Sequence, residues 1–202
     1  MAVIIVLGIG PGSRDLHLVN FDNYLKNAQV VIGSQRQLAS LNKDIQNKSK
    51  LLPALNELKI YLLDNSQKRI VILASGDPLL YGIGSWIKAN ITNQPVKIIP
   101  GISSIQYCFH QLGISMNNSY LTSSHGRKPN FDFVLQHEKI GMVTDQYFGP
   151  REIAAEICKR KQKRWLYVGE NLSYPDERIT KCNPEHMLQR KFDMNVVIIT
   201  NA

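Results

Sequence analysis

The chain has 202 residues, of which 44% are hydrophobic and 20% are charged, and its formal net charge is +8. This composition is typical of a globular chain with a buried core, in one large domain or two small ones. No apolar run is long enough to span a bilayer, and the apolar start from Met1 to Ile9 lacks the features of a signal peptide. The positive charge favours an anionic partner, either a nucleic acid or a ligand rich in carboxylates or phosphates.

The cysteines and histidines indicate neither a disulfide framework nor a metal site. Cys108, Cys158 and Cys182 are few, odd in number and far apart, and the five histidines form no cluster. Such usage is typical of a reducing compartment. We therefore expect a cytoplasmic protein that holds no metal through its own side chains.

In the first half of the chain, predicted strands and helices alternate, which favours a parallel sheet. Apolar runs predict strands at Ala2–Leu7, Gln29–Ile32, Ile70–Ala74 and Val96–Ile99, and a short edge strand at Leu51–Pro53. The runs at Ala2–Leu7 and Ile70–Ala74 are expected to be buried. Apolar spacing predicts a helix through Leu16, Val19 and Leu25, and further helices at Gln35–Leu41, Leu55–Leu63, Gly82–Asn90 and Ile105–Leu112. The polar stretch Asn42–Lys50 is expected to be a surface excursion.

Three of the predicted strands end in loops rich in glycine or proline, namely Gly8–Ser13, Ser75–Pro78 and Pro100–Ser104. Open α/β sheets bind ligands at the carboxyl ends of their strands. Gly76 would let a ligand approach the backbone. Asp77 could accept hydrogen bonds from that ligand or cap the next helix.

The first loop does not fit a dinucleotide-binding fingerprint. Its third glycine, Gly12, arrives one residue early and follows Pro11. The second strand ends in Gly33 and Ser34, without the acidic residue that would hold a ribose. NAD and FAD are therefore disfavoured. In the third loop, Ser103 and Ser104 precede a helix, so they could cap it or hold a carboxylate.

The pattern changes after a plausible link at Gly113–Asn118. Strands are predicted at Tyr120–Ser124, Ile140–Thr144, Trp165–Val168 and Asn195–Thr200, with helices at Pro150–Lys161 and, more briefly, Glu185–Arg190. We expect an α/β protein with a mostly parallel N-terminal domain at residues 1–115 and a smaller mixed domain at residues 119–202. Ligands favour domain interfaces, so the glycine loops are expected to face a cleft between the domains.

Taken together, these loops resemble the tetrapyrrole methylase family over nearly the whole chain. The matching segments are Gly8–Gly12, Ala74–Gly84 and Pro100–Ser104. A fourth segment, Val168–Ile179, is similar to the branch that methylates C-5 of cobalt-precorrin-7 in cobalamin biosynthesis. The chain departs from the family pattern at His17–Val19, where many members carry a Leu-Thr pair.

The resemblance implies S-adenosyl-L-methionine as the cofactor, with S-adenosyl-L-homocysteine as its product, in a homodimer. The cofactor contacts that it implies are Pro11, Ser75, Gly76, Asp77, Leu80, Ser103, Ser104, Thr144 and Leu172. Candidate substrate contacts are Gly10, Gly12, Tyr81, Arg36 and Arg178. Because the chain ends at Ala202, a C-15 methylase and decarboxylase is expected to be a separate partner.

Methyl transfer from S-adenosyl-L-methionine depends on alignment of the two reactants and requires no nucleophilic side chain of the protein. An electron-rich ring carbon attacks a sulfonium methyl in line, so positioning and exclusion of water supply much of the rate. Asp77, Tyr81 and Glu170 are the candidate bases for a later proton removal. Cations could clamp the carboxylates of an anionic tetrapyrrole. The candidates are Arg14, Arg36, Arg127, Lys128, Arg151 and Arg178.

Two other functions are compatible with parts of this sequence. A nearby alternative keeps the cofactor and methylates another precorrin or uroporphyrinogen. A distant one is a basic nucleic-acid-binding protein, which would expose aromatic side chains among basic residues. Trp165, Tyr167 and Phe133 instead lie in apolar, strand-like patterns, so we expect no nucleic acid and no membrane partner.

Overall fold

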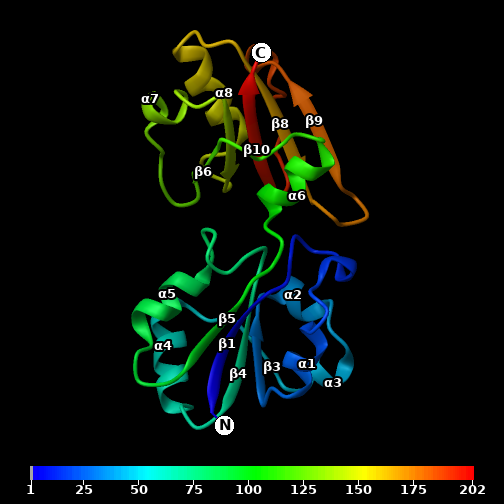
Figure 1. Cartoon of the computed structure of the whole chain (residues 1–202), viewed down its shortest axis with the longest axis vertical. Coiled ribbons are helices and arrows are strands. Elements are labelled where there is room, and N and C mark those ends of the chain that lie inside the picture. The colour runs from blue at the N-terminus through cyan, green and yellow to red at the C-terminus, as the bar shows by residue number, and fades with distance from the viewer. Residues whose placement is uncertain (1) are drawn as a thin grey trace. The chain divides into compact units, whose positions relative to one another are not determined.

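The computed structural model describes residues 2–202, and the chain divides into two compact units (Figure 1). The first unit ends at Ser103, and the second spans Ser104–Ala202. Each unit holds its own five-stranded sheet, which confirms the expected α/β class. Helix α6 (Ser104–Gln111) belongs to the second unit, whereas the expected domain division falls after this helix.

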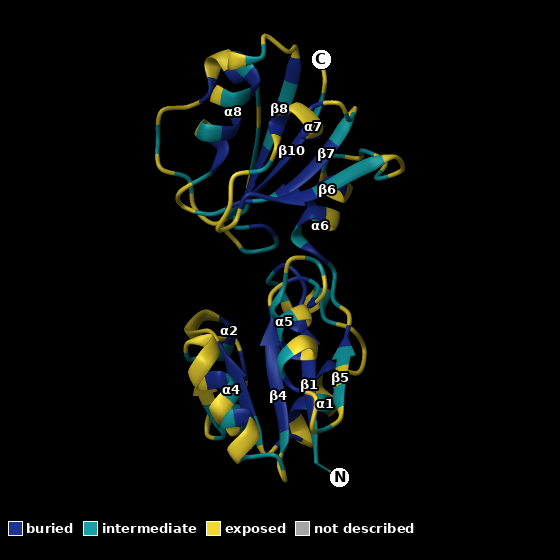
Figure 2. Ribbon diagram, turned by 90° about the vertical axis from the view of Figure 1, so that its left-hand side faces the viewer, coloured by how far each residue is buried: buried dark blue, intermediate teal, exposed yellow. Residues whose placement is uncertain are grey.

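The first sheet is parallel and has the strand order β3-β2-β4-β1-β5. Its strands are β1 (Val3–Gly8), β2 (Val30–Gly33), β3 (Ser49–Leu51), β4 (Arg69–Ala74) and β5 (Val96–Ile99). The central strands are almost wholly buried (Figure 2), as expected of parallel strands that are covered on both faces. The predicted strands of this sheet and the edge position of β3 are confirmed, and β5, at the opposite edge, is only partly buried.

Successive side chains of the first sheet pack alternately into two hydrophobic cores, one on each face of the sheet. Ile5 and Leu7 of β1 pack with α1 (Phe21–Lys26), α2 (Gln35–Ala39) and α3 (Lys43–Gln46). Ile4 and Val6 pack with α4 (Leu55–Asp64) and α5 (Ile83–Asn90) on the other face. This alternation follows from the two-residue period of a strand.

The predicted helix through Leu16, Val19 and Leu25 is wrong in its first half. A 3-10 turn, η1 (Arg14–Leu16), ends where the His17 amide donates to the Arg14 carbonyl, and α1 begins only at Phe21. Val19 precedes α1 and is 101% exposed, whereas Phe21 and Leu25 are the residues that α1 buries. The expected surface excursion Asn42–Lys50 contains α3 and the start of β3.

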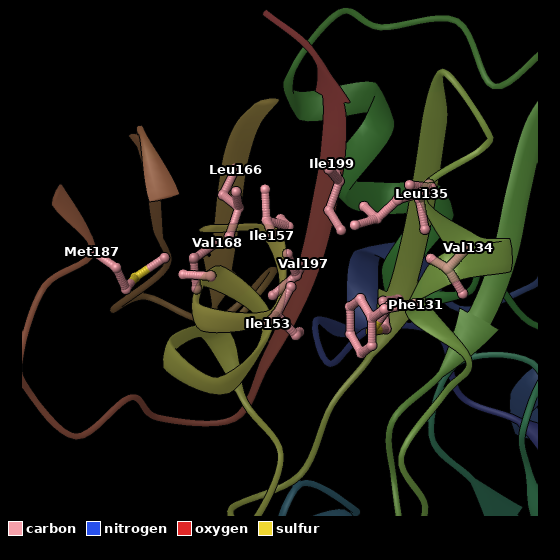
Figure 3. Close-up of a cluster of buried hydrophobic side chains, with 13 residues drawn as sticks. Phe131, Val134, Leu135, Ile153, Ile157, Leu166, Val168, Met187, Val197 and Ile199 are labelled. Carbon is pink, nitrogen blue, oxygen red and sulfur yellow. The ribbon is translucent and has the colours of Figure 1, made fainter. Parts of the chain in front are cut away.

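The second sheet is mixed and has the strand order β6-β7-β10-β8-β9. Its strands are β6 (Ser119–Ser123), β7 (Lys139–Val143), β8 (Arg164–Glu170), β9 (Arg178–Cys182) and β10 (Asn195–Asn201). Strands β6 and β7 are parallel, while β10 runs antiparallel to β7 and β8. Helix α8 (Pro150–Lys159) packs Ile153 and Ile157 against β8 and β10, and α7 (Phe131–Val134) extends the same core (Figure 3).

Two glycines explain why α6 packs within the second unit. A Cβ atom on Gly141 of β7 would lie 2.4 Å from Cγ2 of Ile105, and one on Gly169 of β8 would lie 2.9 Å from Sγ of Cys108. The missing side chains therefore let α6 rest directly on this face of the sheet. Ile105 and Cys108 are fully buried there, and burial raises the pKa of the Cys108 thiol to about 12.

Three details of the second unit differ from the sequence predictions. The helix expected at Glu185–Arg190 is wrong, because Asn183 caps only a 3-10 turn, η2 (Pro184–His186). Strand β9 lies at the sheet edge and is only partly buried, so it has no apolar run to reveal it. Phe133 is not in a strand-like segment but in α7, with 47% of its surface exposed.

Within residues 2–202 no helix is long and apolar enough to cross a membrane.

Candidate functional site

The carboxyl ends of β4, β1 and β5 lie next to one another at one edge of the first sheet. The parallel register pairs Gly8 with Ala74 and Leu7 with Ile99, so the three strands end at the same level. The loops that follow them therefore start side by side. These are the three glycine- or proline-rich loops that the sequence singled out, and we call them the first, second and third loops in chain order.

The first and second loops are joined by their backbones. The Gly76 amide donates to the Gly10 carbonyl at 2.8 Å, and the Gly10 amide donates to the Gly76 carbonyl at 3.3 Å. Both residues have left-handed backbones, with φ of 71° at Gly10 and 63° at Gly76. Glycine adopts this conformation without strain, which explains its presence at both positions.

The third loop packs so closely against both of the others that no side chain fits between them. A Cβ atom on Gly101 would lie 2.2 Å from the Gly76 carbonyl oxygen, and one on Gly8 would lie 2.6 Å from the Gly101 nitrogen. Neither position has room for a side chain. Part of the glycine pattern therefore serves contact between loops, and not only the approach of a ligand.

Asp77 ties the second loop to the third. Its Oδ1 accepts hydrogen bonds from the amides of Leu79 at 2.8 Å and Leu80 at 3.2 Å, and its Oδ2 accepts one from the Gly101 amide at 3.3 Å. The sequence prediction that Asp77 caps the next helix is wrong, because α5 begins only at Ile83 and its N-cap is Gly82; Asp77 instead holds the turn that follows β4. Tyr81, four residues on, is 47% exposed and has a left-handed backbone with φ of 55°.

The other candidate residues of the first unit occupy the same edge of the sheet. Pro11 is buried in the first loop, and Ser103 is buried at the end of the third. Ser75 is exposed at the end of β4, where its Oγ accepts a hydrogen bond from Nε2 of Gln37 at 2.9 Å. Arg36, beside Gln37 in α2, is exposed. Sequence reasoning did not select Gln37, since a lone glutamine near a helix start carries no motif.

The remaining candidate cofactor contacts belong to the second unit. Ser104 is the first residue of α6. Thr144 directly follows β7, and its hydroxyl lies 2.8 Å from both the backbone and the side-chain oxygen of Asn195, so it donates to one of them. Leu172 is 4% exposed and packs against Gly169. Both side chains are thus fixed by contacts within their own unit.

Glu170 is a buried carboxylate at the centre of an ion cluster. It pairs with Arg178 and Arg190, and its Oε1 accepts a hydrogen bond from the Asp193 amide at 3.1 Å. Burial alone would raise the Glu170 pKa, but the hydrogen bonds from Arg190, Arg178 and the Asp193 amide outweigh it and hold the pKa at about 2. A general base works best with a pKa near the working pH, so the geometry disfavours Glu170 in that role.

The cluster holds the segment that the family resemblance singled out. Asn171 and Ser173 have left-handed backbones, with φ of 47° and 67°. The Asn171 amide donates to the Met194 carbonyl at 2.9 Å, and the Ser173 amide donates to Oε2 of Glu177 at 2.5 Å. This loop is therefore held by its own residues and by the segment just before β10, and Leu172 is held with it.

Several candidate anion clamps already have partners. Arg14 contacts Asn42, Lys128 pairs with Glu156, and Arg178 donates two hydrogen bonds of 3.1 Å to Glu170 while its side chain stays 53% exposed. Arg127 and Arg151 are exposed, and Nε of Arg127 donates to the Ser123 carbonyl at 3.2 Å. Among residues 2–202, no group of three or more histidine, cysteine or acidic side chains is placed to hold a metal ion.

Comparison with known sequences gives a consistent result. A family profile described as Tetrapyrrole (Corrin/Porphyrin) Methylases matches residues 3–187. A cobalt-precorrin-7 C(5)-methyltransferase from Salmonella typhimurium is 39% identical over 198 residues, which is 98% of both chains. A probable cobalt-precorrin-7 C(5)-methyltransferase from Methanocaldococcus jannaschii is 30% identical over 88% of both chains. A decarboxylating precorrin-6Y C(5,15)-methyltransferase from Sinorhizobium sp is 29% identical, and the match covers 47% of its length.

Solved structures share the fold over the whole chain. A precorrin-6Y methylase from Archaeoglobus fulgidus has a TM-score of 0.76 and 21% identity, with 100% of this chain and 98% of that one covered. A uroporphyrin-III C-methyl transferase from Thermus thermophilus, complexed with S-adenosyl homocysteine, has a TM-score of 0.77 and 18% identity, with 98% and 96% covered. At these identities the likeness establishes the fold, and it confirms the fold that the loops predicted.

Proposed function

Since the chain belongs to the tetrapyrrole methylase family, we propose that it transfers a methyl group from S-adenosyl-L-methionine to C-5 of cobalt-precorrin-7 in cobalamin biosynthesis. The observation that carries this proposal is the 39% identity to a cobalt-precorrin-7 C(5)-methyltransferase over 98% of both chains. The three joined loops support it, because they lie where open α/β sheets bind their ligands.

The exposed end of the second loop fits the polar part of such a cofactor. The Ser75 hydroxyl offers a hydrogen bond, and the Asp77 carboxylate has more lone pairs than the three amides that it accepts, so it could also take an ammonium group. We propose that Pro11, Gly76, Leu80 and Ser103 add contacts from the same sheet edge. Ser104, Thr144 and Leu172 are proposed as contacts from the second unit.

The cofactor, when bound, supplies an electrophilic methyl group. The protein has to bind it, orient the ring carbon in line with that methyl and exclude water, which can lower the barrier by several kcal/mol, about 7 to 11 in the best model reactions. We propose Gly10, Gly12, Tyr81 and Arg36 as substrate contacts on the first unit, and Arg178 on the second. The net charge of +8 suits a substrate that bears many carboxylates.

Mass spectrometry on purified intermediates tests the acceptor. The protein is incubated with S-adenosyl-L-methionine and either cobalt-precorrin-7, an earlier cobalt-precorrin or uroporphyrinogen III. We expect the gain of one methyl group on cobalt-precorrin-7 alone. Methylation of another acceptor in its place would redirect the proposal to that tetrapyrrole, and failure to bind S-adenosyl-L-homocysteine at micromolar concentration would remove the methylase activity altogether.

Replacement of Asp77 tests the site on the second loop. Asp77→Asn keeps an acceptor for the Leu79 and Leu80 amides but turns an amide group toward the Gly101 amide, so one tie is lost. We expect S-adenosyl-L-homocysteine affinity to fall about ten-fold in this variant, and further in Asp77→Ala, which loses all three hydrogen bonds. Isothermal calorimetry measures both affinities. Unchanged binding in Asp77→Ala would show that the cofactor lies elsewhere.

We further propose a homodimer in the cytoplasm, with a separate C-15 methylase and decarboxylase as a partner. The match to about half of the Sinorhizobium protein, which is named for both C-5 and C-15 methylation, supports looking for that partner. Sedimentation of the purified protein, alone and with a candidate decarboxylase, measures both associations. A monomer in sedimentation would count against the dimer.

A further inference from the structure

The side chain of Gln37 is buried between the start of α2 and the end of β4. Only 6% of its surface is exposed, and a Cβ atom on Gly33 would lie 3.1 Å from its Oε1. Strands β2 and β4 are neighbours in the sheet, which brings the loop after β2 next to Ser75. Gln37 thus connects two segments that are 38 residues apart in the chain.

Two hydrogen bonds fix which way round the Gln37 amide lies. The Ser34 backbone amide lies 2.8 Å from Oε1 of Gln37, and a backbone amide can only donate. The atom facing Ser34 must therefore be the oxygen. The other end of the side chain, 2.9 Å from Oγ of Ser75, must then be the NH2 group.

This orientation sets the direction of the Ser75 hydroxyl. An amide NH2 group can only donate, so Oγ of Ser75 accepts from Gln37, and the hydroxyl hydrogen has to point to another acceptor. Among the described residues, Gln37 is the hydrogen-bond partner of this hydroxyl. Ser75 directly follows β4, lies beside Gly76 and Asp77, and is exposed. Its hydroxyl hydrogen is therefore available to a ligand at this edge of the sheet.

We infer that Gln37 is a positioning residue that makes Ser75 a hydrogen-bond donor, so that the site takes an acceptor atom of S-adenosyl-L-methionine at this position. The inference rests on the proposed function. A second use of Gln37 is local, because the same side chain completes a capping box with Ser34 at the start of α2. Capping needs only Oε1, whereas the positioning role needs the NH2 group.

Gln37→Glu separates the two uses. Its carboxylate keeps one oxygen for the Ser34 amide but presents the other oxygen to Ser75, whose hydroxyl then donates inward. We expect S-adenosyl-L-homocysteine affinity to fall about ten-fold or more, since an acceptor on the ligand would face an acceptor on the protein. The KM for S-adenosyl-L-methionine should rise while the KM for the tetrapyrrole stays unchanged, and the thermal midpoint should change little.

Two further variants give the controls. Gln35→Glu makes the same change of charge on the exposed first turn of α2, and we expect its affinity to stay within two-fold of wild type. In a Ser75→Ala background, Gln37→Glu should have no further effect, because there is no hydroxyl left to turn. All affinities are measured by calorimetry with S-adenosyl-L-homocysteine.

The outcomes distinguish this inference from the proposed function. Wild-type affinity in Gln37→Glu, or an equal loss with and without Ser75, would overturn the positioning role and leave the methylase proposal intact. An equal loss in Gln35→Glu would assign the effect to charge and would also overturn the inference. If the wild-type protein itself binds no S-adenosyl-L-homocysteine, the proposed function fails and the inference fails with it.

Discussion

Gly101→Ala is expected to abolish S-adenosyl-L-homocysteine binding at micromolar concentration and to lower the rate of methyl transfer by about 100-fold or more. The new Cβ atom would lie 2.2 Å from the Gly76 carbonyl oxygen. That oxygen cannot move away alone, because Gly76 is joined to Gly10 by two backbone hydrogen bonds. The third loop must therefore shift away from the second, and the proposed contacts at Ser75 and Asp77 shift relative to Ser103.

Calorimetry and circular dichroism together separate loss of the site from loss of the fold. Gly8→Ala tests the same contact from the first loop, since its Cβ atom would lie 2.6 Å from the Gly101 nitrogen, and we expect a similar loss of binding. Gly149→Ala is the matched control, because the atom nearest to its Cβ would be the Asp145 oxygen at 3.3 Å. A Gly101→Ala protein that binds as well as wild type would contradict a site built on the contact of these loops.

Glu170→Gln is expected to lower the free energy of unfolding at pH 7 by about 3 kcal/mol. The estimate follows from a pKa held at about 2 in the folded protein against an ordinary 4.5. The variant keeps the shape of the side chain but removes the charge that Arg178 and Arg190 share. Because the Glu170 side chain is 1% exposed, water cannot replace these partners in the folded state.

The same cluster predicts how stability depends on pH. The folded pKa of Glu170 lies below its unfolded value, so its contribution is fully present above about pH 5 and is lost as the pH falls towards 2. Between these values the wild-type protein should lose stability more steeply than Glu170→Gln. Urea unfolding of both proteins at pH 7 and pH 3 measures the difference.

Glu185→Gln provides the control for these measurements. Glu185 is an exposed carboxylate in η2, and we expect its replacement to change stability by less than about 0.5 kcal/mol at either pH. Equal stability of Glu170→Gln and wild type at pH 7 would show that the ion cluster contributes nothing net. Since the cluster holds the loop that carries Leu172, a destabilised variant should also bind the cofactor less tightly.

Much of the fold was predictable because its signals are local. Strands β1, β2 and β4 are runs of Val, Ile and Leu that the first sheet buries on both faces, and such runs are visible without knowledge of the partner strand. The elements that were missed lack this signal. Strand β9 is an edge strand with exposed Arg178 and Lys181, and α7 has only four residues.

The helix predicted from apolar spacing near the start of the chain was wrong in its first half for a physical reason. Leu16, Val19 and Leu25 have helical spacing, but a six-residue helix needs only Phe21 and Leu25 to cover its part of the sheet. The backbone before it is held by the Ser13 cap of η1. Burial against the sheet, which decides such cases, is not encoded in spacing alone.

By itself, the sequence determined the apolar strands, the glycine and proline loops that follow three of them, and the family to which those loops belong. These features depend on neighbouring residues, because backbone freedom and β-propensity act over a few positions. Only the tertiary structure decided which polar groups meet. Gln37 reaches Ser75 across 38 positions, and Glu170 reaches Arg190 across 20. Such pairs form when strand order brings distant segments together, and strand order is a property of the whole packed sheet.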